Sequence, residues 1–143
     1  MNKADFSCIG DLEVRWGDLD ALNHVNNAVY LTYFESGRVV YADSLHQQSP
    51  APRIGGVVAE ATCRYLQQLH FPASVQVCTR ISRIGNTSFD YIAALFYKDQ
   101  DDNPIATFKA RMVCFDQETQ QKFRFPDDAR ELVCAYEKIK PEM

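Results

Sequence analysis

The stretch from Val14 to Tyr41, VRWGDLDALNHVNNAVYLTYFESGRVVY, decides the fold because it joins a strand end, a polar loop and a long helix. Asn26 and Asn27 stand where the helix would begin, and Asn is among the preferred N-cap residues. From Ala28 onward the apolar residues fall on most sides of a helix rather than on one stripe. A helix that is apolar nearly all round is a buried helix. The stretch therefore predicts a central helix around which the rest of the chain packs.

Polar groups are crowded just before this predicted helix. The N-terminus of a helix carries unpaired N–H groups and about half a positive charge. Asp20 lies a few residues upstream of those donors. A carboxylate can activate or replace water, and N–H donors can hold the oxyanion that forms in ester or thioester hydrolysis. The loop and the helix start together predict a site for that chemistry.

The remaining elements follow from apolar alternation and turn signals. A first strand is expected over residues 6–16. The helix is expected to end near Leu45, with a loop from His46 to Arg53. Four more strands with hairpin-like spacing are predicted over residues 56–66, 74–84, 88–98 and 105–116. Consecutive hairpins imply an antiparallel sheet, so the order predicts an α+β domain with about five strands wrapped around one long helix.

A short helix is expected to end the chain. It opens at Pro126, carries acidic residues in its first turn, and is expected to place Lys138 and Lys140 in its last. At 143 residues and 46% hydrophobic content, the chain is expected to form a single domain over residues 1–143.

Charge and composition exclude several classes of function. The net charge of −4 gives no overall attraction to nucleic acid. No apolar run approaches the roughly 18 residues of a membrane span, and the N-terminus lacks the apolar core of a signal peptide, so a cytoplasmic protein is expected. The five cysteines are widely spaced without a C-x-x-C pair, which favours buried thiols over a zinc or redox site.

One motif carries a family resemblance. It consists of Arg15-Trp16-Gly17-Asp18-Leu19-Asp20 and His24-Val25-Asn26-Asn27, followed by Tyr30, Tyr33, Glu35 and Arg38. This pattern resembles the hotdog-fold acyl-CoA thioesterases of the 4-hydroxybenzoyl-CoA thioesterase type. The resemblance implies a sheet that wraps the helix, subunits paired edge to edge as a homodimer or homotetramer, and an active site between the subunits of a dimer. It also implies an acyl-CoA substrate, with no metal or organic cofactor.

The resemblance assigns roles to three residues. Asp20 matches the catalytic carboxylate, which acts either as the nucleophile or as the general base. The main-chain N–H of Asn27 matches the group that polarises the thioester carbonyl. His24 matches a histidine with a catalytic part in plant-type acyl carrier protein thioesterases, but those relatives carry Asn where this chain has Leu22. His24 is therefore expected either to orient water or the carboxylate, or to be a loop histidine with no catalytic part.

Other polar residues receive secondary expectations. Asp18 is expected to cap the turn or to pair with Arg15 or Arg38. Glu35 and Arg38 lie three residues apart on the helix and are expected to form a buried ion pair. Glu35 and Glu60 are reserve candidates for the catalytic carboxylate.

Substrate contacts are expected in two places. Tyr30 is expected in the core or the acyl pocket, which overlap in a hotdog domain. Coenzyme A needs donors and positive charge for its phosphates. Strand positions that could supply the positive charge are Arg80, Arg83, Lys109 and Arg111. The resemblance implies that the turn residues Asn86, Thr87 and Ser88 lie near the pantetheine arm of coenzyme A.

Three alternatives share the fold. They are an acyl carrier protein thioesterase, a hydroxyacyl-thioester dehydratase, and a non-catalytic module that binds acyl thioesters. Release of a free thiol is expected from a thioesterase and from neither of the last two.

Overall fold

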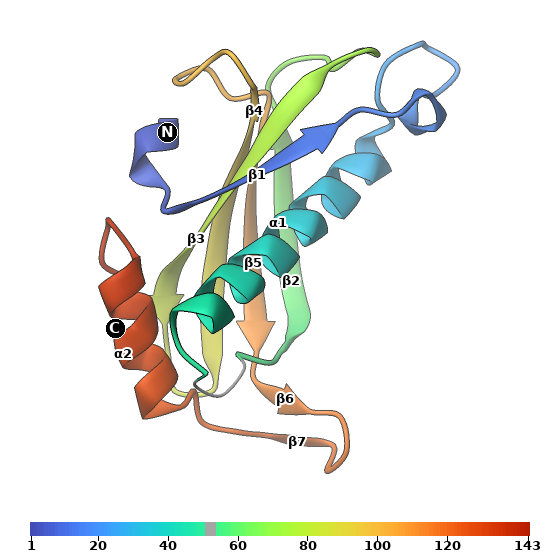
Figure 1. Ribbon diagram of the computed structural model, residues 1–143. Coiled ribbons are helices and arrows are strands. Elements are labelled where there is room, and N and C mark those ends of the chain that lie inside the picture. Colours follow the sequence, from blue (N-terminus) through green and yellow to red (C-terminus); the bar gives the residue numbers. More distant parts are fainter. Residues whose placement is uncertain (51–53) are drawn as a thin grey trace.

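The computed structural model describes residues 1–50 and 54–143 and confirms the expected α+β hotdog architecture (Figure 1). A five-stranded antiparallel sheet has the order β1–β3–β4–β5–β2. Its strands are β1 (Cys8–Glu13), β3 (Ser74–Ile84), β4 (Ser88–Tyr97), β5 (Ala106–Val113) and β2 (Val57–Tyr65). The long helix α1 (Asn27–Gln48) crosses one face of this sheet, and the short helix α2 (Asp127–Tyr136) packs beside its C-terminal end.

Helix α1 begins where the sequence predicts it. Asn26 is the N-cap, and its side-chain oxygen accepts a hydrogen bond from the Ala28 N–H at 2.9 Å. The helix ends at Gln48 rather than near Leu45, because Leu45 is buried and holds the last turns against the core. Residues 46–48 of the predicted loop are therefore helical, and residues 51–53 of that loop lie outside the described part of the chain.

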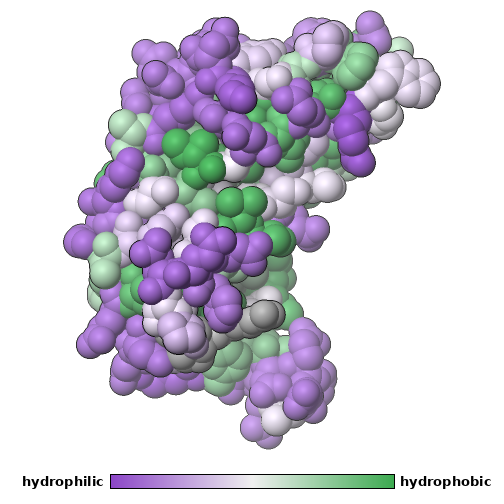
Figure 2. All heavy atoms as spheres, in the orientation of Figure 1, coloured by the Kyte–Doolittle hydropathy of each residue, from purple (hydrophilic) through white to green (hydrophobic). Residues whose placement is uncertain are grey.

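The prediction that α1 is buried nearly all round is wrong for the single chain. Tyr33, Phe34 and Tyr41 face the core, but Leu31 and Val39 are 44% and 55% exposed. One sheet covers only one side of a helix, so the apolar residues on the other side have no cover from this chain. Hydrophobic residues accordingly reach the surface in the band where α1 crosses the sheet (Figure 2).

A close helix–sheet approach sets the position of α1. Gly37 faces β3, and a Cβ atom at this position would lie 2.7 Å from both Thr79 Oγ1 and Val77 Cγ2. The missing side chain therefore lets the helix backbone pack directly on the strand.

Several predicted boundaries need correction. The first strand is shorter than residues 6–16, because 3₁₀ turns at Lys3–Asp5 and Trp16–Asp18 flank β1. The last predicted strand, over residues 105–116, is split into β5 and a two-residue strand β6 (Phe115–Asp116). Strand β6 pairs with β7 (Gln121–Lys122). Lys138 and Lys140 lie beyond the end of α2, although Lys140 Nζ reaches back to donate to the Cys134 carbonyl in the last turn.

A buried carboxyl group anchors the C-terminal segment. Glu137, which is 2% exposed, follows α2 directly and accepts hydrogen bonds from the Tyr41 hydroxyl and from the Ile81 N–H, the latter at 2.8 Å. The ladder between β3 and β4 shifts register just after Ile81, so this N–H is satisfied by a side chain. Burial raises the pKa of Glu137.

This raised pKa predicts a pH-dependent contribution to stability. An acid with a raised pKa in the folded state stabilises most fully below its unfolded pKa, about 4.3 for Glu, and loses that contribution as the pH rises through its folded pKa. Glu137→Gln carries no titrating group and keeps an oxygen that can accept both hydrogen bonds. We expect the melting temperature of wild type to fall relative to that of Glu137→Gln as the pH rises from 4 toward 8. Thermal unfolding of both proteins across this range measures the difference, and a constant difference would contradict the prediction.

Candidate active site

The loop before α1 folds back on itself like a short hairpin. Leu19 and Val25 form an isolated antiparallel bridge, and the Asp20 N–H donates to the His24 carbonyl at 3.0 Å. The Asn26 N–H donates to the Asp18 carbonyl, also at 3.0 Å. These bonds hold the turn that carries Asp20 and His24 against the first residues of the helix.

The two polar side chains of this turn face one another. Asp20 Oδ1 accepts from the Leu22 N–H at 2.9 Å, and Asp20 Oδ2 lies 3.7 Å from His24 Nδ1. The side chains of Asp20 and His24 are 27% and 25% exposed. Asp20 therefore shapes the turn through one oxygen and keeps the other, next to an imidazole, within reach of solvent.

The main-chain N–H of Asn27 is available to a ligand. Within residues 1–50 and 54–143 no acceptor takes a hydrogen bond from it, as is normal for the first residue of a helix. The Asn27 carbonyl accepts from the Tyr65 hydroxyl at 2.9 Å, which ties the helix start to the end of β2. The helix start thus offers a free donor beside the Asp20 turn.

Asp18 is a structural residue, and its expected pairing with Arg15 is confirmed. It is 3% exposed and accepts from the Tyr33 hydroxyl at 2.5 Å and from the main chain and guanidinium of Arg15, each at 3.0 Å. Burial would raise the pKa of Asp18, but the hydrogen bonds from Tyr33 and Arg15 outweigh burial and lower it. An ionised Asp18 therefore locks the loop to α1.

His70 is a neighbour of the site that the sequence did not single out. It lies between β2 and β3, and its Nδ1 is 3.2 Å from the Asn23 carbonyl oxygen. Its ring meets that of His24 edge to face, with centroids 6.2 Å apart. The Leu69 carbonyl also accepts from the Val25 N–H at 2.7 Å. A histidine so far along the chain gives no local pattern that could have pointed to the loop.

The backbone of Asn23 yields a test of this loop. Its φ of 66° lies in the left-handed region, which Asn and Gly tolerate and β-branched residues resist. We expect Asn23→Gly to keep the loop, whereas Asn23→Val should cost about 1–2 kcal/mol of unfolding free energy. Urea denaturation of the two variants measures this. Equal stability of Gly and Val at this position would show that the left-handed conformation does not matter.

The other helix residues named from sequence have mixed outcomes. Tyr30 is buried, with its ring against those of Tyr33 and Tyr65. The predicted ion pair between Glu35 and Arg38 is wrong, since the described residues form no such pair.

Glu35 and Arg38 do not pair because their side chains point in different directions. Arg38 turns inward, with its guanidinium 5.6 Å from the centre of the Phe108 ring, whereas Glu35 is exposed. Glu60, the second reserve carboxylate, is exposed on β2, opposite Arg111.

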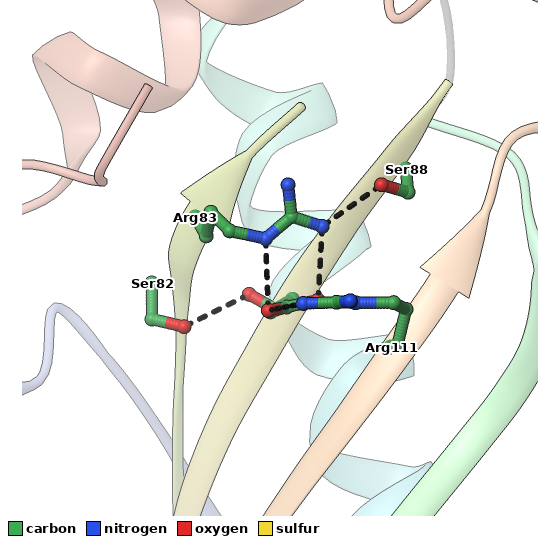
Figure 3. A network of polar contacts seen from close by, with 5 residues as sticks. Ser82, Arg83, Ser88 and Arg111 are labelled. Atoms are coloured by element: carbon green, nitrogen blue, oxygen red, sulfur yellow. Dashed lines mark hydrogen bonds and ion pairs between the residues drawn. The ribbon is translucent and has the colours of Figure 1, made fainter. Parts of the chain in front are cut away.

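A charged network lies next to the turn expected to hold coenzyme A. Asp90 accepts from Arg83 at 2.9 and 3.2 Å and from Arg111 at 2.8 and 2.9 Å. Arg83 also donates to Ser88 Oγ at 2.8 Å, so the structure brings together two of the residues predicted to contact coenzyme A (Figure 3). Hydrogen bonds from Arg111 and Arg83 outweigh burial and hold the pKa of Asp90 well below its usual range.

The net charge of this network is positive. Two guanidinium groups share one carboxylate, which leaves about one positive charge beside the 85–88 turn. The main chains of Asn86 and Thr87 are engaged internally, because their carbonyls accept from the Phe125 and Cys114 N–H groups. Their side chains form none of the hydrogen bonds found among the described residues.

Residues 1–50 and 54–143 lack two further features. No group of three His, Cys, Asp or Glu side chains in this part of the chain is placed to share a metal ion. No helix there is long and apolar enough to cross a membrane.

Two known proteins resemble this chain over most of its length. The chain is 27% identical to protein YsmA of Bacillus subtilis over 90% of its own length and 86% of that protein. It is 34% identical to the chloroplastic acyl-acyl carrier protein thioesterase ATL2 of Arabidopsis thaliana, over 74% of its own length and 57% of that enzyme.

A solved structure is also similar to this chain in sequence and fold. A Thermus thermophilus thioesterase, solved with coenzyme A and Zn, is 26% identical, with a TM-score of 0.78 over 94% of this chain and 97% of that one. Residues 14–133 match the family model of the thioesterase-like superfamily. The chain therefore belongs to the thioesterase-like superfamily of hotdog-fold proteins, the class that hydrolyses thioesters.

Proposed function

We propose that this thioesterase hydrolyses an acyl-CoA thioester at the site formed by Asp20 and the Asn27 N–H. The observation that carries the proposal is the free Asn27 donor at the start of α1, held beside the Asp20–His24 turn by the loop hydrogen bonds. The donor would hold the carbonyl oxygen of the thioester as negative charge develops on it. Such a donor typically lowers a barrier by about 3 kcal/mol.

Asp20 can act either as a nucleophile or as a general base. As a nucleophile, its carboxylate attacks the thioester carbonyl and expels the CoA thiolate, leaving a mixed anhydride that water then hydrolyses. As a general base, it takes a proton from the attacking water, and the tetrahedral intermediate then expels the thiolate. In either role His24, 3.7 Å away, can orient the carboxylate or the water.

We assign the phosphates of coenzyme A to the positive network of Arg83 and Arg111 and to the turn Asn86, Thr87 and Ser88. The spare positive charge and the exposed half of Arg111 support this assignment. The coenzyme A in the structure of the Thermus relative supports a CoA ester as the substrate.

We further propose that residues 1–143 form one domain that works as a homodimer, with homotetramers built from dimers. Strand β2 is one of the two edges of the sheet. Val57 and Val58 on it are exposed, and Val58 lines a cavity together with the exposed Leu31 of α1. An open edge lined with apolar residues favours pairing with a second copy. The active site would then lie between two subunits, as in the 4-hydroxybenzoyl-CoA thioesterase type.

A thiol-release panel tests the substrate class. Wild type would be offered acetyl-, hexanoyl-, palmitoyl- and 4-hydroxybenzoyl-CoA, and an acyl carrier protein loaded with hexanoate. We expect a free thiol from at least one CoA ester at a higher kcat/KM than from the carrier-protein ester. Turnover of the carrier-protein ester alone would move the substrate to that class. If no ester of the panel released a thiol, a dehydratase or a binding module would be favoured.

A further inference from the structure

Two cavities lie in line along one face of α1. The first, of about 230 Å³, lies between α1 and β2 and is lined by Leu31, Glu35 and Arg38 on the helix, Val58 and Ala61 on β2, and Phe108 below. The second, of about 270 Å³, lies under the C-terminal half of α1, where Ala42, Leu45, Tyr91 and Leu132 line it. The helix residues of both cavities recur every three or four positions, so they share one face.

Arg38 stands at the boundary between these cavities. It lines the first cavity and lies over the Phe108 ring, while Ala42, one turn further along α1, already belongs to the second cavity. On the sheet, Ala93 pairs with Phe108 and, two residues away, Tyr91 pairs with Ala110, so each of these two pairs joins a small residue to an aromatic one. Burial raises the pKa of Tyr91, and the positive charge of Arg38 offsets part of that rise.

No polar bond holds Arg38 in this place. Among the described residues it forms no ion pair and no hydrogen bond, although it is half-buried. The hydroxyl of Tyr91, which is 4% exposed, likewise has no hydrogen-bond partner in the described part of the chain. The side chain of Arg38 therefore acts here mainly through its volume and its contact with Phe108.

We propose that Arg38 closes the acyl cavity and so sets the chain length of the substrate, an inference that rests on the proposed thioester hydrolysis. The acyl group begins at the Asn27 N–H and runs along α1 through the first cavity. At 1.5 Å per residue, Asn27 and Arg38 are about 16 Å apart along the helix axis. The substrate class is thus an acyl thioester of short to medium length, and the second cavity stays beyond reach behind Arg38.

Two substitutions at one position test this. Arg38→Ala removes the barrier and joins the cavities, whereas Arg38→Met removes the charge but keeps a long side chain. Val39→Ala, at an exposed neighbouring position, is the matched control. The readout is kcat/KM from thiol release with hexanoyl-, decanoyl- and palmitoyl-CoA, after circular dichroism has shown that each variant is folded.

We expect Arg38→Ala to raise the palmitoyl-to-hexanoyl ratio of kcat/KM by at least about tenfold, since even one added methylene in an apolar pocket is worth that much. Arg38→Met and Val39→Ala should keep the wild-type profile. If Arg38→Ala does not fold, Arg38→Val replaces it, with a smaller shift in the same direction.

The other outcomes overturn the inference in distinguishable ways. An active wild type with an unchanged Arg38→Ala profile would show that the cavities do not join. If Arg38→Ala and Arg38→Met lost kcat/KM equally for every chain length, Arg38 would instead have a role in folding or in subunit contacts. A wild type that releases no thiol from any CoA ester would instead remove the proposed function, and this inference with it.

Discussion

Asp20→Asn is expected to lower kcat/KM for thioester hydrolysis on the order of a hundredfold or more, the usual contribution of a positioned base. The substitution removes the charge and keeps the shape. An Asn side-chain oxygen can accept from the Leu22 N–H as the Asp oxygen does, so the turn should survive. The loss of activity would then result from the missing negative charge at the Asp20 Oδ2 position, beside His24. Thiol release by folded wild type and variant, run side by side, measures it.

Equal activity of the two proteins would reduce Asp20 to a residue that shapes the loop. His24, Glu35 and Glu60 would then become the residues to test. His24→Asn is a useful companion variant, because it separates an orienting role, which leaves partial activity, from no role at all.

The largest expected loss of stability is that of Asp90→Ala. Asp90 is 2% exposed and joins β3 and β5 through its four hydrogen bonds to Arg83 and Arg111. Removing it leaves two guanidinium groups facing each other without their shared anion, which typically costs about 3 kcal/mol or more. Denaturant unfolding measures the cost. The exposed pair of Asp127 with Arg124 provides the control, because Asp127→Ala should change stability little.

The same network predicts acid sensitivity. An acid with a lowered pKa in the folded state stabilises fully above its unfolded pKa, about 3.9 for Asp, and loses that contribution as the pH falls through the folded pKa. The stability gap between wild type and Asp90→Ala should therefore shrink below about pH 4. A gap that stays constant to pH 2 would mean that the ionised carboxylate is not what stabilises the network.

The elements with strong local patterns could be predicted from sequence. The alternation from Ser74 to Ile84 matches β3 at both ends, and the Asn26 cap marks the start of α1. Asp20, His24 and Asn27 are close together in the chain, so the loop has to keep them close in space, whereas their roles are implied by the family resemblance.

What could not be predicted depends on contacts across the fold. The direction of Arg38 is set by Phe108, seventy positions away, and its spacing from Glu35 alone suggested the wrong partner. The role of Asp90 could not be predicted from the sequence around it. Its partners Arg83 and Arg111 lie on the two neighbouring strands, and only the folded sheet brings them next to it. His70 reaches the loop by the same kind of long-range contact.

The most direct test of the central claim is a single turnover of the best CoA ester in water enriched in heavy oxygen, with thiol and acid both quantified. Hydrolysis at the Asp20 site predicts equal amounts of free CoA thiol and free acid. Solvent oxygen enters the new carboxylate when water attacks the acyl carbon, or Asp20 itself when water opens a mixed anhydride at the aspartyl carbon. Hydrolysis at this site also predicts that Asp20→Asn forms neither product at a comparable rate. An acyl group that is hydrated or dehydrated while still bound to CoA, or that is bound and returned unchanged, would contradict the account.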